Sequence, residues 1–426
     1  MIHNLPGWAF VLGGIVWMLN NQGIIGFHEI DWSSYGPLLT IVAGVGLIIA
    51  GGKVRLLKYR VAKRIGEIFE KIDSLYEFSH LLKNDVAEPE YVDMHQIIKL
   101  HANASPLYRA SKLWQSHFVR HNRLLRQNGI SNFKRSVNLG YFQWKIGFRD
   151  DQLVSSLRYV NTFAVLKNFL KIRITSPLTD DVGGIQQNRF IYRFFMASLL
   201  EVTKTVDHHN LLDTIKEPAA GNPWQVFYGD RLISQDLCNS LIEYSSITKN
   251  IAPSAPLVVG ELGAGYGRLA YVFLKAHRNV KYVIFDIPSA IFISQWYLSN
   301  VFPDKNIFRV KSFRNFEEIR EEYEQSDIAF FLPEQMELFP EKHFNLFITI
   351  STLGEMKADQ IRNYFSQIDR LTRGYFYTKQ WIVSVNPNDD VVISQADYPV
   401  PPTWKNIYER PVVVQKSFFE ALYRTN

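Results

Sequence analysis

The chain is poor in cysteine, and long parts of it lack charges of one sign. Of its 426 residues only Cys238 is a cysteine, which excludes a disulfide framework and a zinc site built on several thiolates. Residues 1–52 contain no Lys or Arg, and residues 94–149 contain no Asp or Glu. Residues 53–150 carry 18 basic and 9 acidic residues, whereas the rest of the chain beyond them is nearly neutral. The formal net charge of +6 therefore averages over three chemically different parts.

The missing basic residues coincide with an apolar N-terminal region. The stretch 35–52 has 18 uncharged residues, which as a helix would be about 27 Å long and would span a bilayer core. An earlier apolar run, 5–19, is 15 residues long and predicts either a second span or an interfacial segment. Buried core helices are an alternative interpretation, and a cleaved signal peptide is disfavoured because no basic residue precedes the first run. We expect residues 1–52 to be a membrane anchor with one or two transmembrane segments.

Basic residues appear immediately after this region. Six Lys or Arg fall between positions 53 and 64 without an acid among them, so the positive-inside rule places this side in the cytoplasm. From Val54 to Leu82 apolar residues recur at three- and four-residue steps, which predicts a long amphipathic helix. Its basic first turns predict contact with an anionic lipid surface, although a solvated helix face would explain its later mixed charges. We expect a protein of the inner or plasma membrane whose catalytic part is cytoplasmic.

The acid-free stretch 94–149 combines ten basic residues with many aromatic ones. Within it, Arg120, Arg123 and Arg126 would lie along one helix face. Such a surface suits a phosphate-bearing partner, such as a lipid headgroup, a nucleotide-sugar, a lipid-linked glycan or a nucleic acid. A generic basic face near the bilayer is the alternative. Periodic apolar residues continue through 189–206, which predicts a further helix.

Residues 257–269 read LVVGELGAGYGRL and carry the clearest indication of chemistry. The apolar start predicts a buried strand that ends at Glu261. Glycines follow at Gly263, Gly265 and Gly267, and a helix begins directly after them. Glycines permit a tight turn and let backbone N–H groups at the helix N-terminus approach a ligand. The spacing differs from the G-x-G-x-x-G of dinucleotide-binding sites.

A second expected strand, 281–287, carries Asp286 near its end, 19 residues after the last glycine. A carboxylate at that place can accept hydrogen bonds from both hydroxyls of a ribose. Together, the glycine turn and the two acids resemble the S-adenosylmethionine (AdoMet) site of class I methyltransferases. The resemblance implies AdoMet as the cofactor, bound by these residues: Glu261, Gly263, Gly265, Gly267, Asp286, Gln335 and Ser351.

Strands and helices alternate through the rest of the chain. Further strands are expected at 328–332, 345–351 and 375–385, and a helix at 358–371. Such alternation predicts a doubly wound α/β fold with a parallel sheet, and ligands at the carboxyl ends of its strands. We expect a Rossmann-like methyltransferase domain at 216–426, preceded by a basic, mostly helical region at 53–215 and the anchor at 1–52.

The loop after the expected fourth strand bears on the methyl acceptor. Methyltransferases that act on exocyclic amino groups carry an Asn/Asp-Pro-Pro-aromatic turn there, whereas this chain has Ser-Thr-Leu-Gly-Glu at 351–355. Carbon-5 methylation of pyrimidines needs a catalytic cysteine, and Cys238 lies in no such context. An oxygen acceptor therefore remains. Glu355 is the candidate general base, although helix capping would also explain it, and His343, on an expected surface turn, is a weaker candidate.

Several further segments support a narrower resemblance. They are Phe133-Lys134, Tyr141-Phe142 with Trp144, Gly221-Asn222-Pro223, Ile233 to Leu237, Asn239-Ser240, Ser351 to Met356, and Trp404 to Pro411. With the glycine turn, they make residues 130–425 similar to the sugar O-methyltransferase family. The resemblance implies a sugar hydroxyl as methyl acceptor. The predicted function is a membrane-tethered O-methyltransferase acting on a sugar or a lipid-linked glycan.

Two other functions stay open. The basic stretch would serve a nucleic-acid methyltransferase, but the missing amino-methylation turn and the apolar N-terminus argue against a nucleic-acid substrate. A non-catalytic scaffold that retains the fold is the other alternative, although a scaffold has no need of an open glycine turn. The adjacent His208 and His209 would point in different directions on a helix, so no metal site is predicted. The oligomeric state is not indicated.

Overall fold

The computed structural model describes residues 92–137, 146, 151–179, 187–251, 256–386 and 389–425. The predicted anchor at 1–52 and the predicted amphipathic helix from Val54 to Leu82 lie outside these residues. The same holds for Tyr141, Phe142 and Trp144. Within the described part of the chain, no helix is both long enough and apolar enough to cross a membrane.

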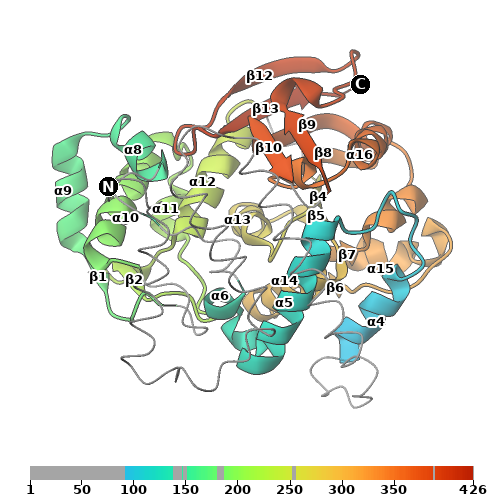
Figure 1. The fold of residues 1–426 in the computed structure, drawn as a ribbon, viewed down its shortest axis with the longest axis horizontal. Coiled ribbons are helices and arrows are strands. Elements are labelled where there is room, and N and C mark those ends of the chain that lie inside the picture. Colours follow the sequence, from blue (N-terminus) through green and yellow to red (C-terminus); the bar gives the residue numbers. More distant parts are fainter. Residues whose placement is uncertain are drawn as a thin grey trace, which may run out of the picture. The chain divides into compact units, whose positions relative to one another are not determined.

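A mostly parallel sheet of eight strands organises the C-terminal half of the chain (Figure 1). In spatial order its strands are β12 (Lys405–Pro411), β13 (Phe418–Arg424), β9 (Thr372–Trp381), β8 (Phe344–Ile350), β4 (Leu257–Leu262), β5 (Val280–Phe285), β7 (Ile328–Phe331) and β6 (Ile307–Phe308). Only β13 runs antiparallel to its neighbours, β9 and β12. Helices α13 (Arg268–Ala276), α14 (Pro288–Val301) and α16 (Ala358–Leu371) connect parallel strands. This is the Rossmann-like α/β sheet expected from the sequence.

The central strands β4, β5, β7 and β8 are buried on both faces, as their nearly continuous apolar sequences require. On β5, Tyr282 and Ile284 belong to one hydrophobic core, whereas Val283 and Phe285 belong to a second core on the opposite face. The first core contains residues of α13 and α14, and the second contains residues of α16. Layers of helices therefore cover both faces, which leaves the strand ends as the place for a ligand.

The N-terminal described helices pack against the first of these cores. They are α4 (Val92–His101), α5 (Lys112–Asn128), α6 (Phe133–Ser136), α8 (Asp151–Leu157), α9 (Thr162–Lys171), α10 (Arg189–Val206), α11 (Leu211–Thr214) and α12 (Gln235–Thr248). Met94 of α4, Leu125 of α5 and Phe195 of α10 are buried in the same core as Val259 of β4. The hydrophobic core is thus continuous across position 216, where the sequence suggested a domain boundary.

Local signals fix several helix starts. The side chain of Asn188 accepts hydrogen bonds from the backbone of Phe190 and Ile191 and caps α10, whose bounds match the predicted helix. The side chain of Ser234 caps α12 in the same way, by accepting a hydrogen bond from the backbone of Leu237. The bounds of α16 also agree with the prediction.

Other elements differ from the predictions. The expected fifth strand at 375–385 is two strands, because β9 ends at Trp381 and β10 (Val383–Asn386) pairs with β11 (Val391–Ser394) in a separate sheet. The helical region also contains a small antiparallel sheet of β1 (Ile172–Ile174), β2 (Val226–Tyr228) and β3 (Arg231–Leu232). The edge strands β12 and β6, and β13 next to β12, were not expected, since their short or mixed patterns resemble loops.

Candidate active site

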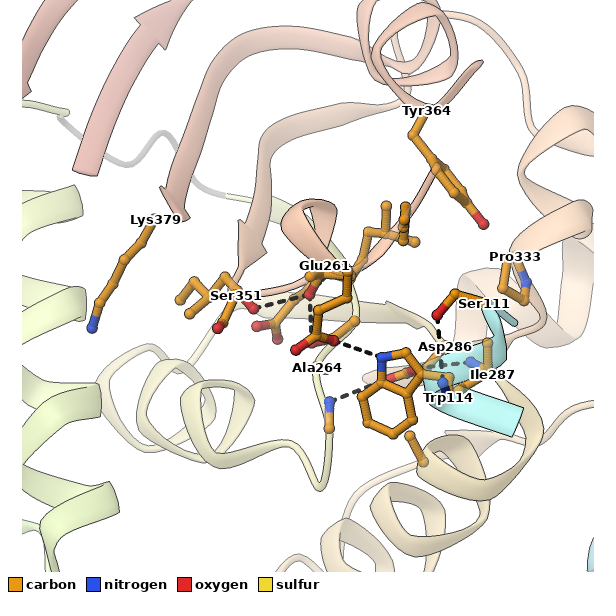
Figure 2. A pocket seen from close by; sticks show the side chains of 18 of the residues that line it. Ser111, Trp114, Glu261, Ala264, Asp286, Ile287, Pro333, Ser351, Tyr364 and Lys379 are labelled. Carbon is orange, nitrogen blue, oxygen red and sulfur yellow. Dashed lines mark hydrogen bonds between the residues drawn. The ribbon is translucent and has the colours of Figure 1, made fainter. Parts of the chain in front are cut away.

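A cavity of about 280 Å³ opens at the carboxyl ends of the central strands. Its wall includes Glu261 at the end of β4, Asp286 just after β5, and Pro333 just after β7. Ser351 after β8 and Lys379 of β9 complete the side formed by the sheet. Figure 2 shows these residues around one space, so the strand order brings together positions separated by more than a hundred residues. Ligands of doubly wound sheets bind at this edge.

The glycine turn forms the floor of the cavity. Gly263, Gly265 and Gly267 have φ angles of 76°, 62° and 85°, a left-handed conformation that side chains with a Cβ rarely adopt. A Cβ at Gly263 would collide with the side chain of Thr352, so the loops after β4 and β8 are packed against each other. Gly263 and Gly265 line the cavity, whereas Gly267 caps α13 and approaches Leu298.

Asp286 ties the end of β5 to the glycine turn. Its Oδ2 accepts a hydrogen bond from the backbone N–H of Gly265 at 2.9 Å, and its Oδ1 accepts one from that of Ile287 at 2.8 Å. Burial nevertheless raises the pKa of the carboxyl to about 7, because charge is costly away from water. Each oxygen keeps a lone pair for a further donor.

Glu261 is a second buried carboxylate in the same wall. It accepts a hydrogen bond from the Tyr282 hydroxyl at 2.8 Å and is only 3% exposed. Burial raises the pKa of Glu261 to about 7 as well, against the opposing effect of the hydrogen bond from Tyr282. Ionising two buried carboxyl groups in one cavity costs free energy unless the cavity receives hydrogen-bond donors or a positive charge.

Glu355 lies on the cavity wall that faces α5. It ends the short helix η5 (Leu353–Glu355), and its Oε2 accepts a hydrogen bond from Trp114 Nε1 at 2.6 Å. Figure 2 shows the Trp114 indole beside Asp286 and Ile287. Ser351 nearby has a φ of 57°, and its backbone N–H donates to the Lys379 carbonyl at 2.7 Å.

Lys379 belongs to a buried ionic group at one end of the cavity. Its Nζ donates to Glu243 Oε1 of α12 at 2.8 Å, and Arg268 Nη2 donates to the same carboxylate at 3.0 Å. Burial by itself would raise the pKa of Glu243, but the two cations lower it to about 2. Glu243 is therefore a charged link between α12, α13 and β9.

Two predicted residues lie elsewhere. Gln335, on η4 (Pro333–Leu338), accepts from the backbone of Leu332 and donates to the Lys311 carbonyl, so it holds the turn and does not line the cavity. His343 is not on an exposed turn as expected. It is half-buried among aromatic rings beside the Tyr323 hydroxyl, and burial lowers its pKa to about 4.

The segment 108–114 supplies a wall of the cavity that the sequence did not predict. Tyr108, Arg109, Ser111 and Trp114 all line it. The side chain of Gln360 on α16 donates to the carbonyls of Pro106 and Arg109 at 3.1 and 2.8 Å and fastens the segment over the strand ends. The acid-free, aromatic composition of this stretch marked it as a binding surface, but nothing local indicated which site it covers.

Residues of α12 form a further wall that the sequence did not assign. Gln235, Asp236 and Asn239 line the cavity. The Oε1 of Gln235, the Oδ1 of Asn239 and the Oε1 of Gln415 are buried without a hydrogen-bond partner among the described residues. Acceptors of this kind are expected to be satisfied by a ligand or water. The described residues contain no cluster of three His, Cys, Asp or Glu placed to hold a metal ion.

Solved structures with a similar fold align with this chain at low TM-scores. No protein-family model matches the sequence, and no curated protein matches it. A crystal structure of a protein from Pyrococcus horikoshii is 14% identical, with a TM-score of 0.34, and the match covers 45% of this chain and 92% of that one.

A glycopeptide N-methyltransferase complexed with sinefungin is 13% identical, covering 47% of this chain and 90% of that chain with a TM-score of 0.31. A SAM-dependent methyltransferase from Aquifex aeolicus is 15% identical, covering 42% and 88% with a TM-score of 0.28.

Proposed function

We propose that the chain is an AdoMet-dependent methyltransferase that modifies a sugar hydroxyl of a glycan or a glycan precursor. The observation that carries the proposal is the pair of buried carboxylates, Glu261 and Asp286, on either side of a left-handed glycine turn at the strand ends. A sheet of this kind has no structural need for two buried acids with raised pKa at a cavity wall.

The cavity residues fit AdoMet in hydrogen bonding and in charge. Asp286 has free lone pairs for the two ribose hydroxyls, while Glu261 is placed to face a positive group such as the ammonium of the methionine part. The unpaired oxygens of Gln235 and Asn239 can accept from further ligand donors. AdoMet, when bound, supplies a methyl group already activated on a positively charged sulfur.

The chain then has to position the acceptor and remove its proton. We assign proton removal to Glu355, whose carboxylate lies on the cavity wall at the end of η5. Trp114 holds this carboxylate through its indole N–H. Trp114, Trp381 and Phe418 present apolar rings to the cavity, which exclude water and offer flat surfaces to a ring-shaped acceptor.

An oxygen acceptor agrees with the loop after β8. The described backbone at 351–355 is a left-handed residue followed by a 3₁₀ turn, with no proline to form an amino-methylation turn. The likeness of residues 130–425 to sugar O-methyltransferases supports a sugar as the class of acceptor. We further propose that residues 1–52 anchor the chain in the inner or plasma membrane, with the catalytic part cytoplasmic and near anionic lipids. A lipid-linked glycan would then be reachable by the site.

Calorimetry with AdoMet on the full-length protein in mild detergent tests the cofactor. Gly265→Leu should abolish the binding heat, because Gly265 lines the cavity and a leucine would strain its left-handed backbone. Gly229→Leu is the matched control, since Gly229 has the same φ of 62° but open space around it. Absence of heat with the wild-type protein would refute the cofactor assignment.

The acceptor is tested by transfer of labelled methyl groups. We expect the label to enter a lipid-extractable glycan fraction and to depend on Glu355. Label in RNA would instead favour a nucleic-acid methyltransferase, and label in neither fraction despite AdoMet binding would reject the sugar acceptor.

A further inference from the structure

Helix α9 (Thr162–Lys171) exposes an apolar stripe. Phe163, Leu166 and Leu170 are 77%, 53% and 70% exposed and recur at three- and four-residue steps along one helix face. Phe190, at the start of α10, is 60% exposed and lies next to the helix, since its ring is 5.5 Å from that of Phe169. We call Phe163, Leu166, Leu170 and Phe190 the α9 stripe.

Most of the exposed large apolar side chains lie in the same part of the chain as this stripe. Of the eleven large apolar side chains that are exposed in the described residues, seven lie on α8, α9, the link between them, and the first turn of α10. In Figure 1, α9 stands on the outer side of α10, with no other labelled element beyond it. Exposed apolar groups gathered in this way mark an interaction surface.

The inner face of α9 is firmly attached, so the exposure does not come from a loose helix. Val165 and Asn168 are buried against α10, and Asn168 Nδ2 donates to Glu201 Oε2 at 2.9 Å. Lys204 Nζ donates to Asn168 Oδ1 at 2.8 Å. Arg193 Nε donates to the Phe169 carbonyl at 2.8 Å and fixes the C-terminal turn of the helix.

Within the segment that carries α9 the charges have one sign, although Asp230 from outside it pairs with Arg173. Residues 152–179 contain no Asp or Glu, but they contain Arg158, Lys167, Lys171 and Arg173. Lys167 and Lys171 are exposed on α9 itself, and Arg158 is exposed just before it. An apolar helix face flanked by Lys and Arg is the pattern of a helix that lies in the interface of an anionic bilayer.

We propose that the α9 stripe docks on the anionic lipid surface of the membrane in which the chain is anchored. Phe163, Leu166 and Leu170 would enter the boundary between headgroups and acyl chains, and the flanking lysines would contact lipid phosphates. The predicted anchor at 1–52 would be one contact between the chain and the bilayer, and the α9 stripe would be a second. Two contacts would hold the catalytic cavity at a constant orientation toward a lipid-linked acceptor.

A second copy of the chain fits this surface less well. A twofold contact through α9 would bring Lys167, Lys171 and Arg158 of both copies together, and no acid within 152–179 is available to neutralise them. Anionic headgroups supply the missing negative charge.

Site-specific fluorescence tests the proposal. The single native cysteine, Cys238, is fully buried and burial raises its pKa to about 12, so an introduced cysteine can be labelled selectively with an environment-sensitive dye. The full-length protein would be labelled at Leu166→Cys, at Glu321→Cys on exposed α15 (Arg320–Gln325), and at Val45→Cys in the predicted anchor. Each would be reconstituted in phosphatidylcholine vesicles containing phosphatidylserine and spin-labelled lipid.

The proposal expects lipid quenching of the dye at Leu166→Cys to exceed that at Glu321→Cys roughly two-fold or more, at a depth of about 5–10 Å. Quenching at Leu166→Cys should also fall when phosphatidylserine is omitted or when Lys167 and Lys171 are both changed to Glu. Equal quenching at positions 166 and 321 would overturn the proposal, and so would a buried but unquenched dye at position 166, which would indicate a protein contact.

The dye at Val45→Cys separates this inference from the proposed anchor. If position 45 is quenched and position 166 is not, the anchor stands and the docking proposal fails. Because these measurements need neither AdoMet nor an acceptor, their outcome is independent of the proposed methyl transfer.

Discussion

At the residue scale, two opposing effects act on the Asp286 carboxyl: backbone hydrogen bonds favour its charged form, and burial disfavours it. Its oxygens receive backbone N–H groups from both Gly265 and Ile287, which shape the turn, while burial keeps its pKa near 7. Glu261 has the same raised pKa for the same reason. In the ligand-free site, burial therefore makes the charged forms of both carboxyls unfavourable. A cofactor with hydroxyl donors and positive charge would stabilise these charged forms.

These two carboxyls predict a pH dependence. Their folded-state pKa values of about 7 lie above the ordinary values of 3.8 and 4.5, so the folded state holds protons more tightly than the unfolded state. The free energy of unfolding of the ligand-free protein should therefore fall as pH rises from about 4 to about 7 and then level off. AdoMet binding should favour the ionised forms and release protons near about pH 6.5, with less release near about pH 8.

Calorimetry in two buffers of different ionisation enthalpy measures that proton release. Glu261→Gln should release fewer protons than the wild type, because one of the two carboxyls is gone. Equal binding heats in both buffers at the lower pH would contradict the predicted release of protons on AdoMet binding.

In the proposed mechanism, Trp114 positions Glu355 through its indole N–H. Trp114→Phe keeps an aromatic ring but removes the 2.6 Å hydrogen bond, so kcat should fall about ten-fold, within the range that general-base catalysis contributes. The acidic limb of the pH–rate profile should move to higher pH, because the ionised carboxylate loses a donor. AdoMet affinity should stay unchanged.

Trp404 provides a matched control for this substitution. Its Nε1 donates to Asp369 Oδ1, also at 2.6 Å, on the face of the sheet covered by α16. Trp404→Phe should leave the pH–rate profile in place. A Trp114→Phe profile identical to that of Trp404→Phe would show that the Trp114 bond has no part in catalysis.

At the scale of elements, Glu243 joins α12 to α13 and β9. Replacing it with Gln leaves Arg268 and Lys379 buried without their counter-charge, so Glu243→Gln should cost about 3–5 kcal/mol of unfolding free energy. The wild-type contribution should be complete above about pH 4.5 and should be lost as pH falls toward 2, because the folded-state pKa is lowered to about 2.

Denaturant unfolding of the full-length protein checks this prediction. Glu317→Gln is the comparison, since Glu317 pairs with Arg320 at the fully exposed surface and its loss should leave stability nearly unchanged. Similar stability of the two variants would mean that the buried ionic group does not hold the helices and the strand together.

At the scale of the whole molecule, charge is distributed by region. Reversing Lys53, Arg55, Lys58 and Arg60 to Glu should invert or release the predicted anchor, because it removes the positive flank that sets orientation. Protease protection in vesicles and membrane fractionation measure both effects. Unchanged topology and fractionation would reject the anchor as predicted. The corresponding region lies outside the described residues, so this remains a prediction from sequence alone.

Much of the sheet could be predicted because its signals are local. An apolar run predicts the strand that contains Glu261, and the glycine spacing predicts the turn after it. Helical periodicity within a short window predicts α16. The strands β12 and β13 could not be predicted, since β13 enters the sheet between β12 and β9 and depends on pairing with both. The separate β10–β11 pair was missed because its apolar residues continue those of β9.

By itself, the sequence determined the α/β class of the C-terminal half and which acids flank the glycine turn. Tertiary structure alone decided that Trp114 reaches Glu355, 241 residues away, that α12 completes the cavity, and that Gln335 turns away from it. It also decided that the apolar residues of α9 face outward. Periodicity reports neighbours within a few residues, whereas contacts between distant segments depend on how the layers pack.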